Sequence, residues 1–94
     1  METQAAERVR SMFSSRELGI LKCLHDLTGL TGSNPIEITE IGFACQIRDT
    51  DEVLRALYTL EGKTLVEPDP PGDLTSSRWR ITPTGMRAVA TMLL

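Results

Sequence analysis

Arginine and hydroxyl side chains gather in two short stretches of this chain, at residues 48–59 and 78–80. A guanidinium group can bind a phosphate, a carboxylate or the edge of guanine through two parallel hydrogen bonds. Hydroxyl groups add single hydrogen bonds to phosphates or bases. The side chains that we expect to make contacts of this kind are Arg48, Thr50, Arg55, Tyr58, Thr59, Arg78 and Arg80.

Each stretch also has an ordinary structural interpretation, and the sequence leaves both open. Arg55 follows Asp51 by four residues, so the two side chains can form an ion pair on a helix surface. In the second stretch, Trp79 can fill the core while Arg78 and Arg80 face solvent on the opposite side of a strand.

Acidic residues at the start of the first stretch work against anion binding. Asp49, Asp51 and Glu52 lie where a helix is expected to begin, and there they can cap the helix. The same charges repel a phosphate backbone. Leu54 and Tyr58 fall together on one flank of this helix, which gives the alternative of a surface for a protein partner.

Neither a catalytic set nor a metal-ligand spacing is present in the sequence. The single histidine, His25, has only Asp26 beside it. Cys23 and Cys45 fall in expected helices without a Cys-x-x-Cys spacing, which favours two buried, reduced thiols. The sequence therefore predicts a protein that is not an enzyme and needs no cofactor or metal.

Composition predicts one globular domain with a mild acidic balance. The chain has 94 residues, of which 40% are hydrophobic and 24% charged, and its net charge is −3. This charge argues against tight, sequence-independent binding to DNA, although a specific regulator can be mildly acidic. The N-terminus lacks the apolar segment of a secretory signal and no apolar run is long enough for a membrane span, so we expect a cytoplasmic protein without membrane contact.

Periodicity and capping residues predict three helices in the first two thirds of the chain. The first covers residues 16–28 after a capping box formed by Ser14 and Glu17. Residues 35–38 can form a short strand that pairs with the later hairpin. The second covers residues 40–46, with Thr39 as its cap and with Ile41, Ala44 and either Cys45 or Ile47 buried. The third covers residues 51–62, with an Asp49–Glu52 capping box and an apolar stripe of Val53, Leu57 and Leu60.

A hairpin and a final helix follow. We expect strands at residues 64–67 and 77–81, with Pro68 ending the first and Glu67 across from the arginines of the second. Thr82 and Pro83 then begin a helix whose apolar side carries Met86, Val89, Ala90 and Leu93. Residues 5–13 form either a short helix or a frayed tail.

Taken in order, residues 15–94 resemble winged helix-turn-helix regulators of the MarR-like bacterial type. The resemblance rests on the helix–turn–helix from Ile38 to Leu60, the strand entry TLVEP and the phrase ITPTGMRAV. It implies an α+β, mainly α fold: a three-helix core, a two- to three-stranded β-wing and a C-terminal helix. It also implies transcription regulation, with the third helix (51–62) in the major groove of duplex DNA and the wing on the backbone or minor groove. The alternative is a winged helix that binds a protein and does not touch DNA.

Two features depart from this pattern. The family usually has a glycine just before the first wing strand, whereas this chain has Thr64 there and Gly62 two residues earlier. The chain also lacks the long flanking helices through which MarR-like proteins dimerise. We therefore expect residues 1–13 to be an N-terminal extension or short helix, residues 14–94 to be a single winged-helix domain, and any homodimer to use the N- and C-terminal helices.

Overall fold

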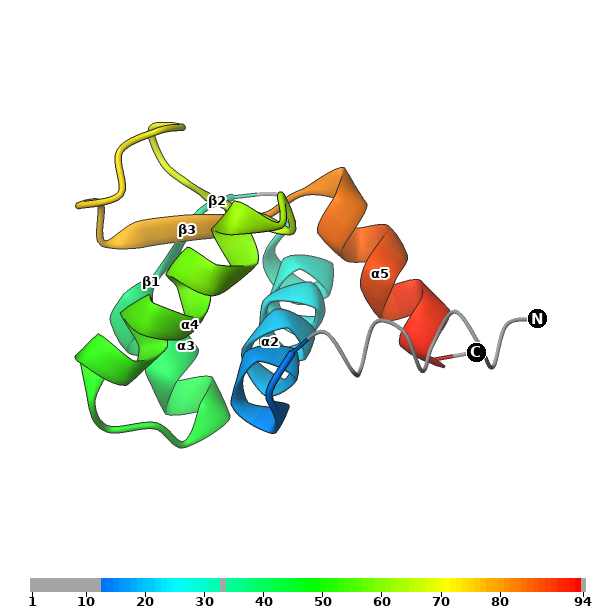
Figure 1. Cartoon of the computed structure of the whole chain (residues 1–94), viewed down its shortest axis with the longest axis horizontal. Helices are drawn as coiled ribbons and strands as arrows, with labels where there is room; N and C mark the ends of the chain where they lie inside the picture. The colour runs from blue at the N-terminus through cyan, green and yellow to red at the C-terminus, as the bar shows by residue number, and fades with distance from the viewer. Residues whose placement is uncertain (1–12, 33, 94) are drawn as a thin grey trace.

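The computed structural model describes residues 13–32 and 34–93, and this part of the chain has four helices and a small sheet (Figure 1). In Figure 1 the sheet lies along one side of α4, α5 lies beyond α2, and the loop between β2 and β3 extends away from the helices. The elements are α2 (Ser15–Thr31), β1 (Ile36–Glu37), α3 (Ile38–Cys45), α4 (Thr50–Gly62), β2 (Val66–Pro68), β3 (Arg78–Ile81) and α5 (Pro83–Leu93). The prediction of a mainly helical α+β chain is confirmed. The prediction for residues 5–13, a short helix or a frayed tail, falls outside the described residues, apart from Phe13, which packs against the core.

The helix α2 begins as predicted and ends later. The Ser14 hydroxyl accepts a hydrogen bond from the Glu17 N–H, and the Glu17 carboxylate accepts one from the Ser14 N–H. The predicted end at Thr28 is too early because Gly29 stays helical. The helix ends at Gly32, whose φ of 81° suits glycine and whose N–H donates to the Thr28 carbonyl.

The start of α3 differs from the prediction. Its N-cap is Glu37, which makes no side-chain capping bond, so the prediction that Thr39 caps the helix is wrong. The sheet supplies the missing acceptor, because the Ile38 N–H donates to the Ser77 carbonyl at 2.8 Å. Ile41 is fully buried, but Ala44 is exposed, so the prediction of a buried Ala44 is wrong too.

A tight turn joins α3 to α4. Gln46 ends α3 in the left-handed conformation, and the Ile47 N–H then donates to the Gly42 carbonyl at 2.8 Å. A Cβ atom on Gly42 would lie 2.8 Å from the Ile47 carbonyl oxygen, so this approach requires glycine. Cys45 and Ile47, the two candidates for burial at this end, are both half-buried.

The helix α4 carries the predicted apolar stripe. The Asp49 side chain caps it by accepting from the Asp51 N–H at 2.9 Å. Val53, Leu57 and Leu60 are fully buried, as the spacing predicts. Their burial fixes which side of α4 faces outward.

The sheet has the strand order β1-β3-β2, with both pairings antiparallel. Ile36 and Pro68 lie on either side of Trp79 in register, so the predicted pairing of residues 35–38 with the hairpin is confirmed. The first hairpin strand is shifted: it covers Val66–Pro68, and the prediction that Pro68 breaks it is wrong. Proline is tolerated there because β2 is an edge strand.

The final helix docks on the same core. The Thr82 hydroxyl accepts from the Gly85 N–H at 3.0 Å, which confirms the predicted cap. Val89 is fully buried and Met86 half-buried, whereas Ala90 is exposed, contrary to prediction. The predicted burial of Leu93 concerns a side chain outside the described part.

Candidate functional site

The predicted contact residues of α4 lie on its exposed side. Arg55 and Thr59 are exposed, and so are Arg48 just before the helix and Thr50 at its first residue. The ion pair between Arg55 and Asp51 is not formed, and no carboxylate of residues 13–32 and 34–93 pairs with Arg55 or Arg48. Both guanidinium groups are therefore free, within the described residues, to meet an external acceptor.

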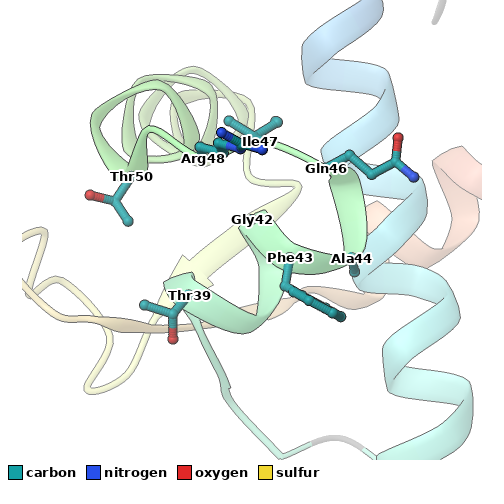
Figure 2. Close-up of a pocket in the computed structure, with 8 residues that line it drawn as sticks. All are labelled: Thr39, Gly42, Phe43, Ala44, Gln46, Ile47, Arg48 and Thr50. Atoms are coloured by element: carbon teal, nitrogen blue, oxygen red, sulfur yellow. The ribbon is translucent and has the colours of Figure 1, made fainter.

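A groove of about 800 Å³ lies between α3 and α4 (Figure 2). In Figure 2, Thr39 and Thr50 lie on its two sides, and Phe43 projects from α3 away from α4. Arg48 and Thr50 are the two predicted contact residues that the groove brings together. Its lining residues are Thr39, Gly42, Phe43, Ala44, Gln46, Ile47, Arg48 and Thr50.

Phe43 is a surface residue that the sequence analysis missed. Its side chain is 89% exposed, the highest value among the large apolar residues described. The signal was present in the periodicity of α3, because Phe43 falls off the face that carries Ile41 into the core. A second exposed apolar side chain, Leu30 at 84%, lies near the end of α2.

One of the three acidic residues at the start of α4 is neutralised. Glu52 forms an ion pair with Arg16 of α2, with both side chains about half exposed. This pairing replaces the predicted capping-box role of Glu52. Arg16 lies 36 residues away along the chain, so no local pattern could have identified it. The remaining acids, Asp49 and Asp51, are exposed.

The two arginines of β3 share one carboxylate. Arg80 Nη2 lies 2.6 Å from Asp69 Oδ1, and Arg78 Nη2 lies 3.9 Å from Asp69 Oδ2. Trp79 between them is fully buried, which confirms the interpretation that it fills the core with the arginines on the other face. Glu67 lies across from Arg80 in register, but Asp69 forms the ion pair. Both guanidinium groups therefore already have a carboxylate partner within the fold.

Tyr58 joins α4 to the hairpin. Its hydroxyl donates to the Leu74 carbonyl at 3.1 Å, and its ring lies 5.9 Å from that of Trp79, tilted by 56°. The ring stays 42% exposed. Leu54, its predicted companion on a protein-binding flank, packs half-buried against the core. Both side chains therefore make contacts within the fold itself.

The cysteines and the histidine belong to no metal-holding group of side chains among the described residues. Cys23 and Cys45 are half-buried free thiols. Burial, helped by a hydrogen bond with Cys23, raises the pKa of Cys45 from 9.0 to about 12. His25 Nδ1 lies 3.3 Å from the Asp26 carboxylate. The described residues contain no His, Cys, Asp and Glu group that could hold a metal ion, and none of their helices is long and apolar enough to cross a membrane.

Comparison with known proteins gives no family for this chain. No family model matches the sequence. No curated protein matches it either.

Proposed function

We propose that this chain is a winged helix-turn-helix protein that binds duplex DNA and regulates transcription. The order of the elements supports the fold: a helix, a short strand, two helices joined by a tight turn, a hairpin and a last helix. The conformation of Thr64 supports it too. Its φ of 62° is left-handed, and it lies two residues before β2, at the position that corresponds to the glycine expected from the resemblance.

The observation that carries the function is the pair of free arginines on and beside α4. Arg48 and Arg55 are exposed and have no carboxylate partner among the described residues. Under this proposal Arg55 reads a base edge and Arg48 binds a phosphate. Thr50 and Thr59 add contacts along the same helix, although the Thr59 hydroxyl already donates to the Arg55 carbonyl at 3.2 Å.

The test is selection of a binding site from a random duplex library, followed by measurement of the affinity of variants for the selected site. Arg55→Ala is expected to weaken binding by about 1–3 kcal/mol because it removes a bidentate base contact. Arg87→Ala is the matched control, since Arg87 is an exposed arginine of α5 whose guanidinium group bonds only the Thr84 hydroxyl among the described residues. Failure to enrich any duplex, or equal affinity of both variants and the wild type, contradicts the proposal.

The exposed Phe43 favours a second function, binding to another protein. Phe43 and the free Arg48 line the same groove, so the partner that fits presents an apolar side chain next to a carboxylate. We expect Phe43→Ser to abolish capture of such a partner, while Leu74→Ser, at a loop residue 44% exposed, retains it. Capture that is insensitive to Phe43→Ser rules this surface out. A homodimer through the N-terminal segment and α5 stays a prediction.

A further inference from the structure

The carboxylate of Asp69 occupies both arginines of the hairpin. Asp69 follows the last residue of β2, and each of its oxygens faces a different arginine of β3, at 2.6 Å from Arg80 and 3.9 Å from Arg78. The Asp69 side chain is 27% exposed, that of Arg80 32% and that of Arg78 56%. The cluster therefore lies at the surface, within reach of a large ligand.

The backbone holds Asp69 in this position. Its N–H donates to the Arg78 carbonyl at 2.9 Å, and its own carbonyl accepts from the Ser76 hydroxyl at 2.6 Å. Among the described residues, the guanidinium group of Arg80 donates to Asp69, while its buried Nε atom has no hydrogen-bond partner. The contact with Asp69 therefore anchors this guanidinium group. This carboxylate is thus fixed against the arginines by the fold.

A carboxylate and a phosphate are alternative acceptors for the same guanidinium group, because the charged oxygens of each accept its N–H bonds. A phosphate of duplex DNA that approached Arg80 would have to displace Asp69 or be repelled by it. Neither side chain of the pair is fully buried, since Asp69 is 27% and Arg80 32% exposed, so Asp69→Asn is expected to keep the fold at a modest cost in stability.

We propose that Asp69 is a specificity-determining residue that competes internally with phosphate. Its carboxylate keeps Arg78 and Arg80 from the DNA backbone and so lowers sequence-independent affinity. Base contacts by α4 then decide where the protein binds, since the ratio of specific to non-specific affinity sets occupancy of a site. This inference rests on the proposed function and explains why the hairpin arginines are neutralised.

The experiment compares Asp69→Asn with Asp73→Asn on a random-sequence duplex. Both variants raise the net charge by one, but the Asp73 carboxylate accepts from Thr75 and pairs with no arginine of the described residues. Asp69→Asn is expected to bind about tenfold more tightly at low salt, and the slope of log affinity against log salt steepens by about one to two phosphate contacts. Asp73→Asn changes both quantities little. The double variant with Arg80→Gln loses most of the gain.

Equal affinities and slopes for the two variants overturn the inference. A second measurement uses the wild-type protein and needs no substitution. The NMR signal of the Arg80 side chain is expected to stay unshifted when duplex is added, because Arg80 keeps its ion pair with Asp69. If the Arg80 signal of the wild type shifts as far as the Arg80 signal of Asp69→Asn, the inference is also overturned. If Arg55→Ala weakens binding while Asp69→Asn matches its control, only the inference fails. If no variant binds any duplex, the proposed function fails with it.

Discussion

Among the described residues, Cys45 is the one whose acid–base chemistry the fold changes most. Its pKa rises from 9.0 to about 12 because the thiol is partly buried and hydrogen-bonded with Cys23. The thiolate is the reactive form, so the folded protein at neutral to mildly alkaline pH holds little of it. Because the pKa is raised on folding, the associated stability is present below pH 9.0 and is lost as pH rises toward about 12.

We expect alkylation of Cys45 by iodoacetamide at about pH 8 to be at least a hundredfold slower in the folded protein than in urea, because a pKa about two to three units higher lowers the thiolate fraction by that factor. Mass spectrometry of the peptide that contains Cys45 measures the rate. The rate in the folded protein rises about tenfold per pH unit. Equal rates in folded and unfolded protein would contradict the assignment.

Thr64 carries backbone strain that a substitution can remove. Its φ of 62° is costly for a β-branched residue, by roughly 1–2 kcal/mol, while glycine adopts it freely. Thr64→Gly is expected to raise the free energy of unfolding by about 0.5–1 kcal/mol after the extra entropy of the unfolded chain is included. Urea unfolding measures it. Lys63→Gly, at a φ of −101°, is the control and lowers stability. A loss of stability in Thr64→Gly would show that the strain is absent.

At the scale of elements, one glycine holds the last helix against the hairpin. A Cβ atom on Gly85 would lie 2.1 Å from the Leu65 carbonyl oxygen and 2.7 Å from Ile81 Cγ1. We expect Gly85→Ala to lower the free energy of unfolding by about 3 kcal/mol, because the helix must move off β3. Gly29→Ala is the matched control, since a Cβ atom there meets nothing within 4 Å. It raises stability by about 0.5–1 kcal/mol in thermal unfolding. Similar effects for both variants would contradict the close approach.

Elements with strong local signals could be predicted from the sequence. The Ser14–Glu17 box and the stripe on α4 depend on neighbours within one or two turns, and both are confirmed. The cap of α3 could not be predicted, because its first N–H bonds a carbonyl of the hairpin that is 39 residues further along (Ser77 minus Ile38). Local pattern decides which segments are helical, while tertiary contacts decide where they begin.

The candidate site was only partly accessible to the same reasoning. The exposed side of α4 follows from its buried stripe, so Arg55 and Thr59 were placed correctly. The engagement of Arg80 by Asp69 depends on the continuation of β2 through Pro68, a residue that the sequence argument placed outside the strand. Phe43 was missed because only polar and charged side chains were considered for this surface, although the periodicity of α3 places Phe43 off the buried face.

At the scale of the whole molecule, the charge balance limits how strongly salt can affect DNA binding. The net charge is −3, and the described residues leave Arg48 and Arg55 unpaired on the proposed DNA-binding side. Arg48 is proposed to bind a phosphate and Arg55 a base edge, so the expected slope is about −1 in log affinity against log salt, and affinity falls about three- to fourfold between about 50 and 200 mM salt. Fluorescence anisotropy on the selected duplex measures it. A slope near zero would contradict contact by these arginines, and one beyond about −5 would require many further cations.

Two contacts hold the loop between β2 and β3: the carboxylate–arginine pair at its first residue, Asp69, and the tyrosine hydroxyl on the carbonyl of Leu74. Its tip between these tethers, at Pro71 and Gly72, is exposed. An epitope or fluorescent peptide inserted there would give up one hydrogen bond, from the Asp73 N–H to the Pro70 carbonyl, and leave both tethers in place. Lengthening a loop costs only about 0.6 kcal/mol per doubling. The tip is thus a natural attachment point for a reporter that leaves the core undisturbed.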